Sequence, residues 1–205
     1  MQVTRSKVFE ETYQNYVRKI LQIDFLSKAV SLGAEIDNNA LLIQLYDVVY
    51  RFSEEGLSGP SGVDVPPAVR VMICKYILTT PETLTELDNK LVTYREFKDS
   101  GPLVSNFTNN TNKTLEQTFS GDVAALKDRA LQFGGKIMAS DTYDLSILFH
   151  AFPRIPVTVN FNDRDDLFPA ACSVLYRASA AQFLDMECLA MTGTLLAGKL
   201  ISQNR

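Results

Sequence analysis

The order in which helical and extended patterns follow one another most constrains the fold of this chain. A helical pattern comes first and last, and two β-type regions lie between, separated by further helical segments. A doubly wound sheet would instead need regular alternation of strands and helices. The order therefore predicts an α+β fold, with a mostly antiparallel sheet covered by helices. No repeat or internal linker divides the 205 residues, so we expect one domain over 1–205.

Residues 5–32 are expected to form one long helix that ends at Gly33. Their apolar residues recur every three or four positions and so share one face: Phe9, Tyr13, Tyr16, Ile20 and Ile23. Paired prolines begin a second helix, because proline suits the first turn. Further helices are expected at 66–78, 114–120, 122–133 and 185–201, the last with Asp185 as its N-cap.

Strand patterns occupy two regions. The runs 40–46 and 48–53 predict either a tight hairpin or one long strand. The stretch 143–161 holds two more runs, separated by prolines that cannot donate to a ladder and are expected in the turn or at an edge. Residues 92–97 are expected to begin extended, and 173–177 fit either a strand or a helix.

Two segments read as loops. Residues 54–67 contain three glycines and three prolines and predict a long flexible loop. Residues 105–114 are polar and low in complexity, which predicts a mobile, exposed loop. Three N-x-T sequons fall in or beside it, at Asn106, Asn109 and Asn112.

Composition limits the classes of partner. The net charge is −4 and no cluster of four or more Lys and Arg occurs, so we expect no nucleic-acid binding. The first residues lack the apolar core of a signal peptide, and the longest uncharged stretch near the C-terminal end has eleven residues, where a bilayer span needs about twenty. We therefore expect a soluble, cytoplasmic protein without membrane contact. The three cysteines form no C-x-x-C pair, which argues against zinc and iron–sulfur sites, and their odd number argues against a disulfide framework.

The densest polar cluster is the run Asn162-Asp163-Arg164-Asp165-Asp166. It follows a predicted strand, and its carboxylates repel one another unless a cation or a helix N-terminus offsets their charge. One interpretation is a hard-metal site with oxygen ligands. The other, which we favour, is a solvated turn whose Asn and Asp side chains bond to the local backbone. A helix–loop–helix calcium site is a poor match, because Leu167 and Phe168 occupy positions that need ligands or Gly.

No common catalytic motif is present: the sequence lacks G-x-G-x-x-G, a Walker loop and H-E-x-x-H. His150 is the only histidine and cannot build a multi-histidine metal site. A boundary histidine with a structural hydrogen bond is the simpler interpretation. Catalytic residues and cofactors therefore stay unknown and no metal ligand is predicted. The candidate ligand-binding residues are His150, Arg154, Asp163, Asp165 and Asp166.

The helices at the two ends of the chain carry more apolar surface than one core usually absorbs, so we predict a homodimer or larger assembly. The last helix also has a face of small residues, Ala190, Gly193 and Ala197, that would let another backbone approach. Internal packing explains that face without a second chain, and we prefer it.

The C-terminal half resembles the prokaryotic domain-of-unknown-function family numbered 3786. Pro153-Arg154-Ile155-Pro156 fits the first piece of the family pattern, and Asp163, Asp165, Asp166, Phe168 and Pro169 fit its acidic turn. Leu167 and Arg177 depart from the pattern, each standing where an acidic residue is expected. The resemblance implies a cytoplasmic protein of an anaerobic-type prokaryote. It also implies longer relatives with an N-terminal four-cysteine iron–sulfur segment, whose cysteines this chain lacks.

Two functions remain open. The first, which we favour, is a non-catalytic ligand-binding or accessory domain of a redox or cofactor-handling system; it rests on the missing catalytic motifs and on the domain pairing that the resemblance implies. The alternative is a small-molecule enzyme that uses the acidic turn 163–166 as a metal or acid–base site, with Arg154 binding an anion. It rests on polar residues gathered beside a strand end, where sites often lie.

Overall fold

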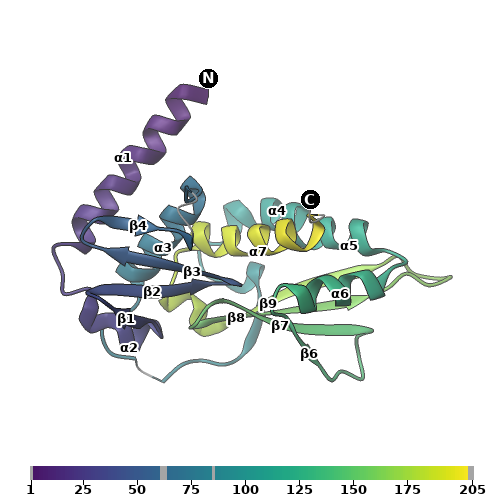
Figure 1. Ribbon diagram of the computed structural model, residues 1–205. Helices are drawn as coiled ribbons and strands as arrows, with labels where there is room; N and C mark the ends of the chain where they lie inside the picture. The colour runs from purple at the N-terminus through teal and green to yellow at the C-terminus, as the bar shows by residue number, and fades with distance from the viewer. Residues whose placement is uncertain (1, 61–63, 85, 203–205) are drawn as a thin grey trace.

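The computed structural model describes residues 2–60, 64–84 and 86–202, with side chains from Glu10 onward. In these ranges the fold is α+β, as predicted, but the strands divide between two antiparallel sheets instead of forming one (Figure 1). The strands are β1 Glu35–Asp37, β2 Ala40–Leu45, β3 Val48–Ser53, β4 Gly56–Ser58, β5 Leu91–Thr93, β6 Lys136–Met138, β7 Leu145–Phe152, β8 Ile155–Asn162 and β9 Ala171–Arg177.

The first sheet has the order β1-β2-β3-β4, so each strand pairs with the next along the chain. Of the two alternatives for 40–53, the tight hairpin is correct: Leu45 pairs with Val48, and Tyr46 between them has a φ of 54°. The predicted loop 54–67 is wrong in its first part, which forms β4. The hydroxyl of Tyr13 accepts a hydrogen bond from Leu57 N at 2.8 Å, and Gly56, at φ 101°, lets the chain pass close to that hydroxyl. Positions 61–63 of that prediction lie outside the described residues.

The second sheet has the order β5-β9-β8-β7-β6. The two runs predicted within 143–161 are β7 and β8, and 173–177 belongs to a strand, β9. Pro153 lies in the β7–β8 turn, as expected. Pro156 is instead the second residue of the central strand β8, opposite His150. Pairing of β8 with β9 begins only at Val157, so Pro156 precedes that ladder.

The predicted helix 5–32 is wrong in its second half. Helix α1 ends at Ile20, and two shorter elements, the 3-10 helix η1 Leu26–Lys28 and the helix α2, follow it. Asp24 accepts a hydrogen bond from Ser27 N at 3.2 Å, and such local side-chain bonds compete with a continuing helix. Ile23 therefore leaves the predicted face and is 40% exposed. The helical bounds are α1 Gln2–Ile20, α2 Ala29–Leu32, α3 Pro67–Thr79, α4 Val104–Phe107, α5 Lys113–Phe119, α6 Val123–Gln132 and α7 Met186–Ile201.

The predicted mobile loop 105–114 is also wrong. Helix α4, a π-helical turn η5 (Thr108–Asn112) and helix α5 follow one another without interruption. Four buried residues recur at every fourth position and bind this segment to the core: Phe107, Thr111, Leu115 and Phe119. The polar residues between them are exposed or half-buried and give the segment its loop-like composition.

Short 3-10 helices complete the described chain: η3 Tyr94–Glu96, η4 Gly101–Leu103 and η6 Ala178–Gln182. Helix α7 begins as predicted, with the Asp185 side chain accepting a hydrogen bond from Cys188 N at 2.9 Å. It runs across the middle of the molecule beside both sheets (Figure 1). The sheets also meet directly, where Tyr46 N donates to Ala151 O at 2.9 Å. Within the described ranges, no helix combines the length and apolar character that crossing a bilayer demands.

Candidate functional site

The residues predicted as a ligand site do not gather at one place. Arg154 immediately precedes β8 and Asp163 immediately follows it. An eight-residue strand is about 26 Å long, so these residues lie at opposite ends of the second sheet. His150 lies on β7 near the Arg154 end, where it pairs with Pro156, and its side chain is exposed. Its pKa is lowered, first by partial burial and then by the nearby charge of Arg177.

Arg154 closes the C-terminal end of α2. Its Nε donates to Ser31 O at 3.0 Å and its Nη2 donates to Val30 O at 2.7 Å. The last carbonyls of a helix have no partner within the helix, and a cation there is favourable. The guanidinium therefore has a structural role, and this occupies two of the donors that an anion would need.

The acidic turn is bound to backbone N–H groups. One oxygen of Asp163 accepts from Gly121 N at 2.6 Å, which ties the turn to the start of α6. One oxygen of Asp165 accepts from both Leu167 N and Phe168 N at 2.7 Å. These hydrogen bonds give the carboxylate oxygens partners without any metal ion. The geometry thus favours the structural interpretation of the turn.

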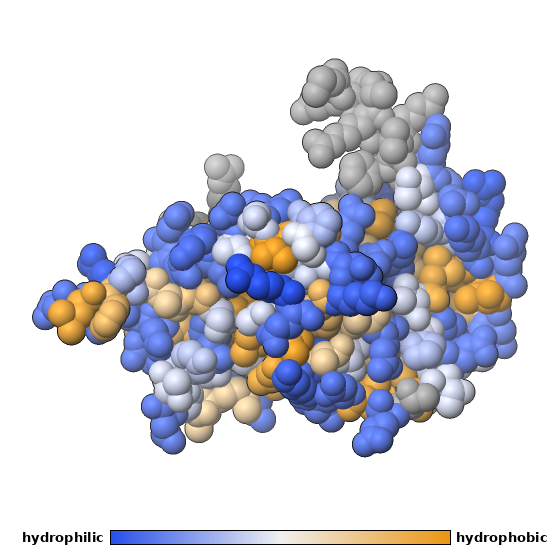
Figure 2. All heavy atoms as spheres, turned by 180° about the vertical axis from the view of Figure 1, so that it is seen from behind, coloured by the Kyte–Doolittle hydropathy of each residue, from blue (hydrophilic) through white to orange (hydrophobic). Residues whose placement is uncertain are grey.

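The turn projects from one end of the molecule, and apolar atoms gather at the tip of this projection (Figures 1 and 2). Leu167 and Phe168 are 81% and 67% exposed. At its base, Asp163 and Asp165 line a cavity of about 570 Å³ with Asp144, Glu116 and Lys113, whereas Asp166 does not line it. In the part of the chain that the structure describes, no three carboxylate, His or Cys groups are placed to hold a metal ion.

The three thiols are buried. Burial raises the pKa of Cys74 and of Cys172 to about 12, and it raises that of Cys188 as well. Because the thiolate is the reactive form, such cysteines are poor nucleophiles at neutral pH.

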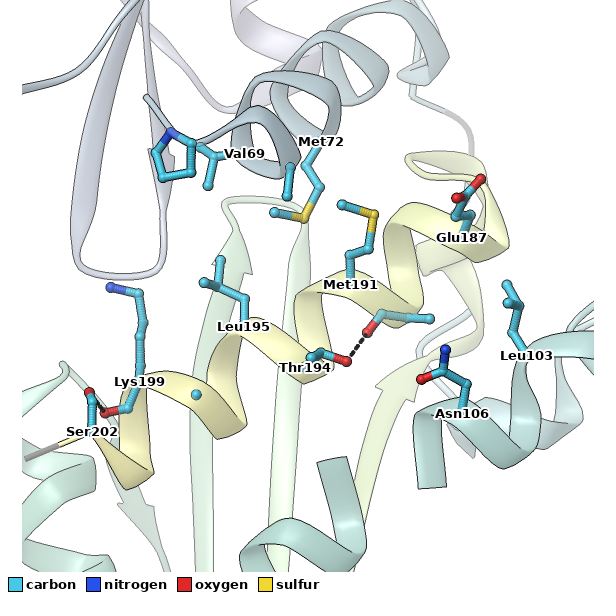
Figure 3. Close-up of a pocket in the computed structure, with 14 residues that line it drawn as sticks. Val69, Met72, Leu103, Asn106, Glu187, Met191, Thr194, Leu195, Lys199 and Ser202 are labelled. Carbon is cyan, nitrogen blue, oxygen red and sulfur yellow. Dashed lines mark hydrogen bonds between the residues drawn. The ribbon is translucent and has the colours of Figure 1, made fainter. Parts of the chain in front are cut away.

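A groove that the sequence did not indicate lies between α3, α4 and α7 (Figure 3). We call it the α3–α7 groove. It has a volume of about 660 Å³, which is within the usual range for ligand sites. Its lining is Pro66, Ala68, Val69, Met72, Leu103, Asn106, Glu187, Ala190, Met191, Thr194, Leu195, Gly198, Lys199 and Ser202.

The groove is apolar along its length and charged at its ends. Met72 of α3 and Met191 of α7 point toward one another across it, while Glu187 and Lys199 mark its two ends (Figure 3). Glu187 and Lys199 are twelve residues apart on one helix, so the groove runs about 18 Å. Lys199 Nζ lies 2.5 Å from Asp47 Oδ1, which leaves the Glu187 carboxylate as the less compensated charge.

The small face of α7 divides between this groove and the interior. Gly193 and Ala197 are buried, and Gly193 lies against Phe107, so the preferred internal packing is correct for them. Ala190 is half-buried and lines the groove. Helical spacing identified the small residues, but it could not show that α3 and α4 stand beside them.

The family model described as domain of unknown function (DUF3786) matches residues 24–199. The chain belongs to the DUF3786 family. The DUF3786 match begins after α1 and ends within α7, and it includes the acidic turn and all of the groove lining except Ser202. Comparison with curated proteins and with solved structures gave no match.

Proposed function

We propose that this DUF3786 protein is a non-catalytic binding domain whose α3–α7 groove takes a small molecule with an elongated apolar body and a cationic end. The observation that carries the proposal is the lining of the groove: apolar side chains along about 18 Å and few polar groups, placed mainly at its ends. Met72 and Met191 add a flexible, polarizable surface that adapts to the shape of a ligand. We propose a cationic end for the ligand because Glu187 places a carboxylate at one end of the groove, whereas Lys199 at the other end is already paired with Asp47.

Titration calorimetry with two ligands of equal length, decylamine and decanoate, tests the proposal. We expect decylamine to bind about tenfold more tightly, a difference of about 1.4 kcal/mol. Glu187→Gln should remove the preference and leave decanoate binding unchanged. Met191→Glu should abolish binding of both ligands, because it puts a charge on the apolar floor.

Leu131→Glu is the matched control, because Leu131 is a half-exposed apolar residue on α6 outside the groove. It should bind both ligands as the unaltered protein does. Binding that is absent in the unaltered protein, or that survives Met191→Glu, would show that the groove is not the site.

The alternative function, an enzyme with a metal or acid–base site at the acidic turn, has one supporting observation. Asp163 and Asp165 share their cavity with Asp144 and Glu116. The backbone hydrogen bonds to Asp163 and Asp165 weigh against it.

Calcium and magnesium separate the two interpretations of the turn. Because backbone donors already stabilise the carboxylates, we expect millimolar amounts of either ion to leave the melting temperature unchanged. A rise that disappears in Asp165→Asn, which keeps an acceptor for the turn, would instead establish a metal site there.

Five narrower expectations are also proposals. Service to a redox or cofactor-handling system, and an anaerobic prokaryotic origin, rest on the family resemblance. A cytoplasmic location and the lack of nucleic-acid partners rest on the sequence. The homodimer rested on surplus apolar surface, and much of that surface is buried here, including Tyr13, Val17, Leu189, Leu196 and Leu200. Light scattering tests the homodimer, because a measured mass near the 22.9 kDa of one chain would exclude it.

A further inference from the structure

The π-helical turn Thr108–Asn112 interrupts an otherwise α-helical segment in the middle of the fold. A π-turn is rare, costs regular hydrogen bonding and is frequently found at functional sites. Here the turn packs against α7 and β9 on its inner side, while Asn109 and Asn110 on its outer side are exposed. The packing of Phe107, Thr111, Leu115 and Phe119 does not by itself explain why a π-turn is present at this place.

Two buried polar atoms mark the same turn. Thr111 Oγ1 and Asn112 Oδ1 are the only buried side-chain nitrogen or oxygen atoms among the described residues that have no hydrogen-bond partner. Elsewhere on this segment threonines are satisfied: the hydroxyls of Thr114 and Thr118 donate to backbone carbonyls at 3.0 and 2.7 Å. An unsatisfied buried acceptor is unfavourable, and a ligand that donates to it removes the cost.

Asn112 lines a further cavity, of about 260 Å³, whose lining also includes Tyr94, Arg95, Val104, Phe107 and Thr108. The rings of Tyr94 and Phe107 stack at 4.5 Å between centroids and form an aromatic wall. The Tyr94 hydroxyl already donates to Met186 O at 2.7 Å, so the polar atom of this side chain is satisfied. Arg95 is exposed at the rim. The lining thus combines a residue with an unpartnered acceptor, one guanidinium and apolar side chains.

This cavity is separate from the α3–α7 groove. Leu103 and Asn106 line the groove, whereas Val104 and Phe107 line the cavity, so α4 presents one face to each. A ligand in the cavity would contact the same short helix that forms one wall of the groove.

We propose that the cavity at the π-turn binds a small carboxylic acid with an apolar side chain and a hydroxyl or amino donor, that is, a 2-hydroxy acid or an amino acid. The donor group bonds to Asn112 Oδ1. The carboxylate pairs with the fork of donors on Arg95. The apolar side chain lies against Tyr94, Phe107 and Val104. The inference is independent of the ligand that the groove takes.

Three probes that differ by one group each test the chemistry: 3-phenyllactate, 3-phenylpropionate, which lacks the donor, and 2-phenylethanol, which lacks the carboxylate. In calorimetry we expect 3-phenyllactate to bind at least about tenfold more tightly than either of the others. In ¹⁵N correlation spectra its addition should shift the side-chain amide signal of Asn112 and leave that of Asn109, an exposed neighbour, in place. Equal affinities for the three probes, or no binding, would overturn the proposal.

Variants assign the two polar contacts. Asn112→Ala should lower the affinity for 3-phenyllactate to that of 3-phenylpropionate and leave the latter unchanged. It should also raise the melting temperature of the ligand-free protein, because it removes an unsatisfied buried acceptor. Asn109→Ala is the control and should change neither affinity. Arg95→Gln, at an exposed position that tolerates change, should weaken both carboxylates equally and leave 2-phenylethanol unaffected. An Asn112→Ala protein with a lower melting temperature and unchanged affinities would show that the amide is structural.

Discussion

Helix α7 packs closely in the core at Gly193, which lies against Phe107 and Tyr176. An ideal Cβ on Gly193 would lie 2.4 Å from Phe107 Cε2 and 3.0 Å from the Tyr176 hydroxyl, so a side chain fits there only if the neighbours move. That hydroxyl is in turn 3.1 Å from Thr192 Oγ1, and Tyr46 donates to Thr192 O at 2.8 Å. Glycine is therefore needed at this position for space and not for its backbone freedom.

Gly193→Ala should destabilise the protein by about 1–3 kcal/mol, the usual cost of adding a methyl group to a packed core. Gly198→Ala is the matched control, because Gly198 lies on the same helix with no atom within 4 Å of its added methyl. Helix propensity should then make that variant more stable by up to about 1 kcal/mol. Urea unfolding of both variants measures the effects. Equal changes would mean that α7 is not packed against Phe107 as described.

At the scale of elements, the start of α7 depends on charge. The Asp185 carboxylate accepts from Cys188 N and lies 2.8 Å from Lys75 Nζ on α3. Burial opposes the charged form, but the bonds from Lys75 and from Cys188 outweigh it and lower the pKa of Asp185 below its ordinary value of 3.8. The same pair links α7 to α3 at the Glu187 end of the groove.

A carboxyl with a lowered pKa stabilises the fold above its ordinary pKa, and the stabilisation is lost as pH falls through the lowered value. Asp185→Asn should therefore cost stability at pH 7 and at pH 5, and the difference from the unaltered protein should shrink below about pH 4. Because the Asp185 side chain is 40% exposed, the effect should stay near 1 kcal/mol or less. Asp166→Asn, at an exposed position, is the control and should change the stability at pH 7 by no more than about 0.5 kcal/mol. If the two proteins differed in stability by the same amount at every pH, the effect would come from the N-cap hydrogen bond to Cys188 N alone and not from the charge of Asp185.

Elements with complete local signals could be predicted from the sequence. Helix α7 has its cap at Asp185, α3 has paired prolines at its start, and α6 has Gly134 at its end, with a φ of 73°. The predictions of a helix over 5–32 and of a loop over 105–114 were wrong. The first missed a local hydrogen bond, and the second relied on the average composition of the segment. The first helix stops at Ile20 and Asp24 bonds to the separate turn that follows, while the polar residues of 105–114 concealed the buried positions at every fourth residue.

The groove and the π-turn cavity could not be predicted, because each exists only where distant segments meet. Met72 and Met191 are more than a hundred residues apart and face one another only after α3 packs beside α7. The acidic turn was identified correctly as a cluster, but its ties to Gly121 and its distance from Arg154 depend on the arrangement of the sheet.

At the scale of the whole molecule, the buried side chains of both sheets belong to one hydrophobic cluster. We therefore expect a single unfolding transition, as for one domain over 1–205. The chain has eight tyrosines and no tryptophan, so tyrosine fluorescence and far-UV circular dichroism give two independent signals. Their urea midpoints should coincide. If the first sheet unfolded before the second, the two urea midpoints would differ, and the chain would consist of two domains.

The central place of α7 bears on how the protein is made. Leu189, Leu196 and Leu200 are fully buried, yet this helix is the last described element to leave the ribosome. Until then Phe107 and Tyr176 lack the helix that covers them. At about 5–20 residues per second, this exposure lasts for seconds. The described part of the nascent chain therefore completes its fold only after α7 has been synthesised, and in that interval the side chains that α7 covers are accessible to chaperones.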